Sequence, residues 1–80
     1  MLPVDYSECG ANGAADTAAV SVSGIKSGDS LLAVIQWASG EDPVALDTTD
    51  YTVADGTITG ATIDTSGKLL WVIWATPRAS

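Results

Sequence analysis

Ten carboxylates are the groups in this 80-residue chain that most invite a chemical role, either as calcium ligands or as a glycosidase pair. Asp47, Asp50 and Asp55 are spread over an expected loop and strand end, and they lack the Asp-x-Asp-x-Asp-Gly loop with its terminal glutamate. A glycosidase needs two carboxyl groups facing each other across a cleft, and so short a chain has little material to wall one. Several of the aspartates precede glycine or a hydroxyl residue, where aspartate favours turns. We therefore interpret them as solvated turn residues.

Nucleophilic catalysis has no basis in this sequence, because it contains no histidine and only one cysteine, Cys9. Without an imidazole, neither the thiol nor the many hydroxyl groups have a base to activate them. The same composition excludes a disulfide within one chain and a metal site of the Cys/His type. Lys26 and Lys68 lie in expected turns, where they solvate loops or pair with acids across a subunit contact. We predict a protein that is not an enzyme and that binds no cofactor or metal.

The three tryptophans, Trp37, Trp71 and Trp74, are the remaining candidates for a binding function. Tryptophan fills cores, anchors protein–protein contacts, and can stack on the faces of sugars. Trp71 and Trp74 are three residues apart, so on a strand they face opposite sides of the sheet. We favour the core and a subunit interface for these side chains, and we keep an exposed sugar-stacking surface built on Trp37 or Trp74 as the alternative.

Two segments, residues 31–37 and 69–75, are apolar at nearly every position and are too short for ordinary helices. Each follows a Ser-Gly turn signal, so each is predicted to be a β-strand with two apolar faces. A chain of this size buries only about 60% of its unfolded surface. The sequence predicts no helix to cover the second face of such a sheet, so we expect another copy of the protein or a partner to cover it.

Shorter alternating segments complete the expected fold. Residues 17–23, 50–54, 57–59 and 61–63 are predicted strands, and Asp55-Gly56 is a strong signal for a tight turn. The short connection over residues 24–29 favours an antiparallel pair between 17–23 and 31–37. The sequence thus predicts an all-β protein, a small antiparallel β-sandwich or partly open barrel of five to seven strands. We assign residues 17–77 to this domain and residues 78–80 to a C-terminal tail.

Residues 1–16 carry no periodic apolar pattern, and we predict an extended N-terminal arm that is poorly ordered alone. Leu2, Val4 and Tyr6 alternate within it and would contact a groove on a neighbouring subunit. Together with the tryptophans they form the predicted subunit or capsid interface: Leu2, Val4, Tyr6, Trp37, Trp71 and Trp74.

The formal net charge is −7, with ten acidic and three basic side chains. Such a surface repels phosphates and anionic lipids, so we expect no binding to nucleic acid or membranes. The N-terminal residues show neither the basic nor the apolar region of a secretory signal, and no apolar run approaches the roughly 20 residues that cross a bilayer. We expect a protein made in a cytoplasm, which agrees with its unpaired cysteine.

The order of motifs resembles a known family. A Val-Ser-Val strand leads to Gly-Ile-Lys-Ser-Gly-Asp-Ser-Leu-Leu-Ala-Val-Ile, then to Asp-Tyr-Thr-Val, Asp-Gly-Thr-Ile, and finally Asp-Thr-Ser-Gly-Lys-Leu-Leu-Trp-Val-Ile-Trp. Over residues 17–76 this resembles the small capsid decoration, or cement, proteins of tailed bacteriophages. The resemblance implies a β-rich module that assembles as a homotrimer, binds the major capsid protein on the outside of the head, and stabilises the virion.

Overall fold

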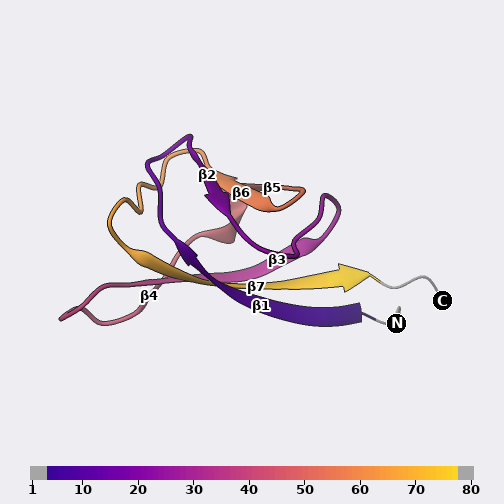
Figure 1. Cartoon of the computed structure of the whole chain (residues 1–80), viewed down its shortest axis with the longest axis horizontal. Coiled ribbons are helices and arrows are strands. Elements are labelled where there is room, and N and C mark those ends of the chain that lie inside the picture. Colours follow the sequence, from indigo (N-terminus) through magenta and orange to yellow (C-terminus); the bar gives the residue numbers. More distant parts are fainter. Residues whose placement is uncertain (1–3, 78–80) are drawn as a thin grey trace.

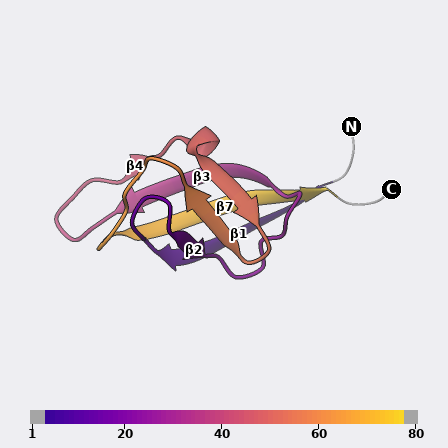
Figure 2. The ribbon, with the colours of Figure 1, turned by 90° about the horizontal axis from the view of Figure 1, so that it is seen from above.

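Two antiparallel sheets pack face to face in the computed structural model, which describes residues 4–77 (Figures 1 and 2). Sheet A has the order β1-β7-β3-β4, and sheet B has the order β2-β6-β5. A single 3-10 turn, Thr48–Asp50, precedes β5. The predicted all-β sandwich is confirmed. The strands are β1 (Val4–Asn12), β2 (Ala19–Ser21), β3 (Ser30–Trp37), β4 (Val44–Ala45), β5 (Tyr51–Ala54), β6 (Thr57–Gly60) and β7 (Leu69–Pro77).

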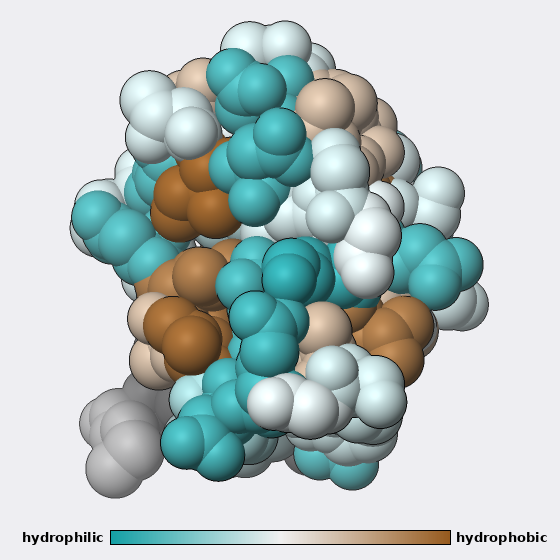
Figure 3. Space-filling view, turned by 90° about the vertical axis from the view of Figure 1, so that its left-hand side faces the viewer, coloured by the Kyte–Doolittle hydropathy of each residue, from teal (hydrophilic) through white to brown (hydrophobic). Residues whose placement is uncertain are grey.

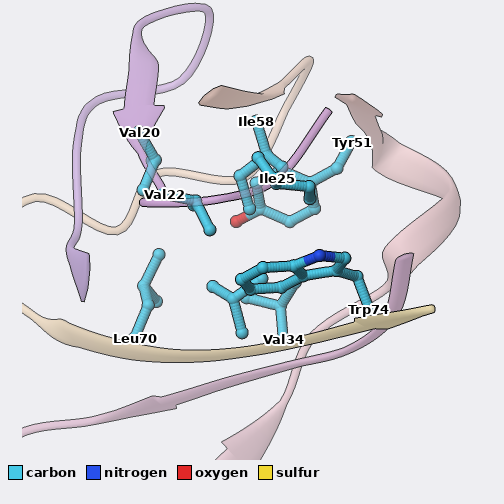
Figure 4. Close-up of a cluster of buried hydrophobic side chains, with 9 residues drawn as sticks. Val20, Val22, Ile25, Val34, Tyr51, Ile58, Leu70 and Trp74 are labelled. Carbon is cyan, nitrogen blue, oxygen red and sulfur yellow. The ribbon is translucent and has the colours of Figure 1, made fainter. Parts of the chain in front are cut away.

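The hydrophobic core lies between the two sheets (Figure 4). The two predicted apolar segments become β3 and β7, which lie side by side in the middle of sheet A and direct alternate side chains into this core. Removing this apolar area from water is the main force that holds the sheets together, at about 25 cal/mol per Å². The buried cluster consists of Val20, Val22, Ile25, Val34, Tyr51, Ile58, Leu70, Val72 and Trp74.

The connection after β2 crosses from sheet B to sheet A, and so the predicted pairing of 17–23 with 31–37 is wrong. β2 pairs with β6, whereas β3 pairs with β7 and β4. The Val22 amide donates to the Gly56 carbonyl at 2.9 Å, and the Gly56 amide donates to the Ile25 carbonyl at 2.7 Å. These bonds hold the crossing against the β5–β6 turn. Because Val22 and Ile25 are fully buried, the crossing is itself part of the core.

The N-terminal segment is extended, as expected, but it is not a separate arm. Val4–Asn12 forms β1, which pairs with β7 along its whole length, from Val4 opposite Pro77 to Asn12 opposite Leu69. Cys9 and Ala11 pack against the core cluster. The division of the chain at residue 16 is therefore corrected, and β1 belongs to the domain. Leu2 and the predicted tail over residues 78–80 lie outside the described residues.

A close crossing fixes the chain just after β1. Thr65 is fully buried, and its hydroxyl accepts from the Ala14 amide at 3.0 Å and donates to the Ala14 carbonyl at 3.1 Å. The Thr65 amide also donates to that carbonyl, at 2.9 Å. Gly13 lies so near that a Cβ atom there would be 1.9 Å from the Thr65 carbonyl oxygen. Only glycine therefore allows the two segments to approach in this way.

Replacing Thr65 with valine should lower the free energy of unfolding by about 1–3 kcal/mol, because it removes the buried hydroxyl and leaves the half-buried Ala14 amide and carbonyl with fewer partners. Thr65→Ser is the matched control, since it keeps the hydroxyl. Urea denaturation followed by circular dichroism measures both variants. A Thr65→Val protein as stable as Thr65→Ser would contradict this role for the hydroxyl.

Candidate functional site

The outer face of sheet A, which points away from sheet B, is the strongest candidate for a functional surface. Trp71 lies there between Gly10 of β1 and Ile35 of β3, and Trp37 lies opposite Leu69. Trp37, Leu69 and Trp71 are 45%, 42% and 41% exposed. No element of residues 4–77 covers this face (Figure 1). Figure 3, viewed from the left-hand end of Figure 1, shows hydrophobic surface on both sides of a hydrophilic strip.

The opposite outer surface, on sheet B, has a different character. Its outward positions alternate with the buried side chains of Val20, Tyr51 and Ile58, and they carry only small or hydroxyl side chains. A polar outward face of this kind is typical of a sheet that is solvated on one side. The sandwich is therefore asymmetric, and sheet A is the side that needs a cover. The outward residues of sheet B are Ala19, Ser21, Thr52, Ala54, Thr57 and Thr59.

A groove of about 290 Å³ opens on the outer face of sheet A where β3 ends and β7 begins. The Trp71 ring packs beside Gly10, where a Cβ atom would be 3.7 Å from the ring. Near the same end Lys68 forms a 2.7 Å ion pair with Glu41 of the β3–β4 connection. Both side chains are substantially exposed, so the pair adds little stability. The groove is lined by Gly10, Ala11, Asn12, Trp37, Leu69, Leu70 and Trp71.

The structure separates the residues of the predicted interface. Tyr6, Trp37 and Trp71 are exposed, and all three belong to the outer face of sheet A. Trp74 is only 2% exposed and lies in the core, so we remove it from the candidate surface. The three-residue spacing to Trp71 places the two rings on opposite faces of the sheet, and the position of sheet B makes the Trp74 face the inner one. Leu2 and the side chain of Val4 lie outside the described parts of the chain.

Sequence reasoning missed the aliphatic part of this surface. Leu69 is exposed, and Ile35 and Ile73 are half-buried beside Trp71 and Ala33. Once Trp71 is assigned to the outer face, the two-residue period of a strand assigns Leu69 and Ile73 to the same face. The signal was therefore present in the register of β7.

The carboxylates are engaged in turns, as the sequence indicated. Asp47 accepts from the Thr49 hydroxyl and amide at the start of the 3-10 turn, at 2.6 and 2.9 Å. Asp50 accepts from the Thr62 and Ile63 amides at 3.0 and 3.2 Å. These bonds to Asp50 hold a bend at Ala61 and Thr62, so the strand predicted over residues 61–63 is wrong.

These hydrogen bonds favour the ionised carboxylates. The pKa of Asp50 is lowered, chiefly by the Thr62 amide and then by the Thr62 hydroxyl. The Thr49 hydroxyl and amide lower the pKa of Asp47, and the Ser66 hydroxyl and amide lower that of Asp64. A carboxylate whose pKa is lower in the folded than in the unfolded state stabilises the fold above the unfolded value, near pH 3.9. That contribution is lost as the pH falls through the folded pKa.

The variant Asp50→Asn should therefore melt below the wild-type protein at pH 7, and the difference between their melting temperatures should shrink as the pH falls below about 4. Comparing the two proteins separates this effect from the relief of general repulsion in a chain of net charge −7. Thermal melts at pH 7, 5 and 3 measure it. A difference that stays constant across this range would contradict the role of the Asp50 carboxylate.

Within residues 4–77, no group of three or more histidine, cysteine, aspartate or glutamate side chains could hold a metal ion. Cys9 is half-buried, and its thiol donates to the Gly10 carbonyl at 3.2 Å. Among the described residues there is also no helix of the length and apolarity that a bilayer span requires.

Comparison with known proteins returned no match among family models, curated proteins or solved structures. The candidate site therefore depends on the geometry described above.

Proposed function

We propose that this protein is a non-enzymatic structural protein, which functions by docking the outer face of sheet A on another protein. The observation that carries this proposal is the exposure of Trp37, Leu69 and Trp71 on a face that the chain itself leaves uncovered. Large aromatic and aliphatic side chains gathered on one exposed face mark interaction surfaces, and tryptophan is among the residues that contribute most to binding.

The resemblance to capsid decoration proteins supplies the partner in this proposal. The protein would bind the major capsid protein on the outer surface of a phage head and stabilise the shell, as a trimer if it follows that family. Its charge of −7 suits a basic docking surface. The engagement of Asp47, Asp50 and Asp64 in turns agrees with a structural and not a catalytic use of the carboxylates.

Binding to capsids tests the proposal directly. Trp71→Ser and Trp37→Ser should each weaken co-sedimentation with shells of the cognate major capsid protein by about 30-fold, which corresponds to the 2 kcal/mol typical of an interface anchor. Thr52→Ala, on the outer face of sheet B, is the control and should bind as the wild type does. Full binding by both tryptophan variants would rule out this face as the docking surface.

A carbohydrate-binding or adhesion module is the second candidate, and the groove is the observation that favours it. Trp37 and Trp71 both line the groove, and Asn12 provides an amide beside them. Indole rings with a nearby amide suit the apolar face and the hydroxyl groups of a sugar. Buried Trp74 has no part in such a platform. Titration with sugars should change the tryptophan fluorescence under this reading and leave it unchanged under the first.

A further inference from the structure

The free edge of β1 is the longest unpaired edge in the described part of the chain. β1 has nine residues and lies at the border of sheet A, whereas the other three sheet edges are strands of two, three and four residues (Figure 2). Monomeric proteins protect long edges with charged side chains, above all lysine, and with proline, bulges or very short strands. Val4–Asn12 contains neither proline nor lysine, and its register with β7 runs without a bulge; its charged residues are the two carboxylates Asp5 and Glu8.

The direction of each backbone group on β1 follows from one hydrogen bond. The Gly13 amide donates to the Lys68 carbonyl, so the odd-numbered residues of β1 direct their amides and carbonyls toward β7. The even-numbered residues direct theirs outward. The Gly10 carbonyl agrees with this assignment, because it accepts a hydrogen bond from the Cys9 thiol at 3.2 Å. The outward positions include Tyr6, Glu8, Gly10 and Asn12.

We propose that β1 pairs with β1 of a second copy in antiparallel orientation, so that two sheets A join across a two-fold axis into one continuous sheet. An antiparallel strand is complementary to itself, because each outward amide meets an outward carbonyl of the other copy. This inference depends on the edge of sheet A. It does not depend on the docking of the outer face described under the proposed function.

Charge and side-chain size select one register among those that the outward groups allow. A register is centred on the residue through which the two-fold axis passes, so that this residue lies opposite its own copy. Centring the pair on Glu8 would place two carboxylates directly opposite each other, which is destabilising. Centring it on Cys9 places Glu8 opposite the partner subunit's Gly10, where no side chain competes with the carboxylate. Centring it on Ser7 also separates the charges, but it places Tyr6 opposite the partner subunit's Glu8.

Tyr6 gives the reason to favour the register centred on Cys9 and to identify the occupant as a second copy. In that register Tyr6 lies opposite the partner subunit's Asn12, on the same outer face. Asn12 lines the apolar groove that also contains Trp37 and Trp71. Tyr6 is the most exposed large hydrophobic residue of the described chain, at 72%. Pairing thus brings the ring of each copy to the groove of the other.

Pairing of β1 with β1 of a second copy gives a dimer, whereas the family resemblance implies a trimer. A three-fold ring would require β1 to pair with a different edge of its neighbour. The other edge of sheet A is β4, which has only two residues, Val44 and Ala45. Pairing of β1 with itself uses the long edge on both sides and closes after two copies.

Light scattering after gel filtration tests the assembly on the full chain. At micromolar concentration we expect twice the chain mass of 8.1 kDa. Glu8→Pro removes an outward amide that the β1–β7 ladder does not use, so the monomer should keep its circular dichroism spectrum while the dissociation constant rises at least about tenfold. Glu8→Ala keeps the amide and should remain dimeric. A monomeric wild-type protein, or a Glu8→Pro protein that dimerises as well as Glu8→Ala, would overturn the proposal.

Oxidation of Cys9 tests the register. Centring on Cys9 makes the two thiols a non-hydrogen-bonded pair with Cα atoms about 4.5 Å apart, within the range of a disulfide. Mild oxidation with diamide should therefore cross-link the wild-type protein. The variant Cys9→Ser/Ser7→Cys places its thiols four residues apart along each strand, about 13 Å, and should cross-link at least tenfold more slowly. Faster cross-linking of that variant would overturn the register.

The outer face provides the control that separates the two proposals. Trp71→Ser removes one wall of the groove that the partner subunit's Tyr6 approaches, but it removes none of the backbone bonds between the two β1 strands. It should therefore weaken capsid binding while the dimer and the Cys9 cross-link persist. A dimer that Trp71→Ser dissociates and Glu8→Pro does not would refute edge pairing while supporting docking through the face. Loss of capsid binding with an intact dimer in the Trp71→Ser variant leaves both proposals standing.

Discussion

Replacing Trp74 with alanine should destabilise the fold by about 3–5 kcal/mol, the range measured when large aromatic side chains are removed from cores. Trp74 is 2% exposed and lies between the sheets among Val34, Tyr51 and other members of the core cluster (Figure 4). Domains of this size have a total stability of only about 5–15 kcal/mol. We therefore expect the variant to be largely unfolded at 37 °C or to melt far below the wild-type protein.

Trp71 is the matched control for Trp74, because it is the same residue type in the same strand, three positions away. Trp71→Ala should lower the free energy of unfolding by about 1 kcal/mol or less, since its side chain is 41% exposed on the outer face. Guanidinium denaturation of both variants measures the contrast. Equal losses of stability would mean that the two faces of β7 are not inside and outside as described.

Removing residues 1–12 should abolish cooperative folding. β1 supplies one of the two neighbours of β7, and Cys9 and Ala11 pack against the core. Without β1, the edge of the apolar strand β7 would be open to aggregation. The sequence alone suggested that this segment is an extended arm, separate from the domain, that contacts a neighbouring subunit. The structure predicts loss of the fold itself.

Circular dichroism, thermal melting and gel filtration of the deletion variant check this prediction. A shorter deletion that stops before Val4 keeps β1 complete and serves as the control. A truncated protein that lacks residues 1–12 and still melts in one sharp transition would show that β1 is dispensable for the core.

The sequence predicted those strands whose own side chains specify them. β3 and β7 are continuous apolar runs, and the Asp55-Gly56 turn between β5 and β6 has the chemistry that a hairpin requires. β1 could not be recognised in this way, because Ser7, Cys9, Gly10 and Ala11 have weak strand propensity and little periodicity. Its strand conformation is imposed by the free edge of β7, which is a tertiary effect.

The sequence was sufficient to predict that an apolar sheet face is left uncovered, but not to predict which residues lie on that face. Two-faced apolar strands indicated that one face needs a cover, and the spacing of Trp71 and Trp74 indicated that only one of them is inside. Which one lies inside depends on where sheet B packs, and the sequence does not encode that locally. The crossing through Val22 and Ile25 places β2 and β3 in different sheets. It likewise depends on contacts between residues far apart in the sequence, such as the bonds to Gly56.

The central place of β7 in sheet A has a consequence for how the protein is made. β7 comes last among the described strands, yet β1 and β3 both pair with it, and Asn12 of the first strand meets Leu69. Pairing between residues so distant along the chain slows folding, because the long intervening loop must close first. During synthesis β1 must wait for nearly all of the described chain to emerge, and sheet A can close only as translation reaches β7.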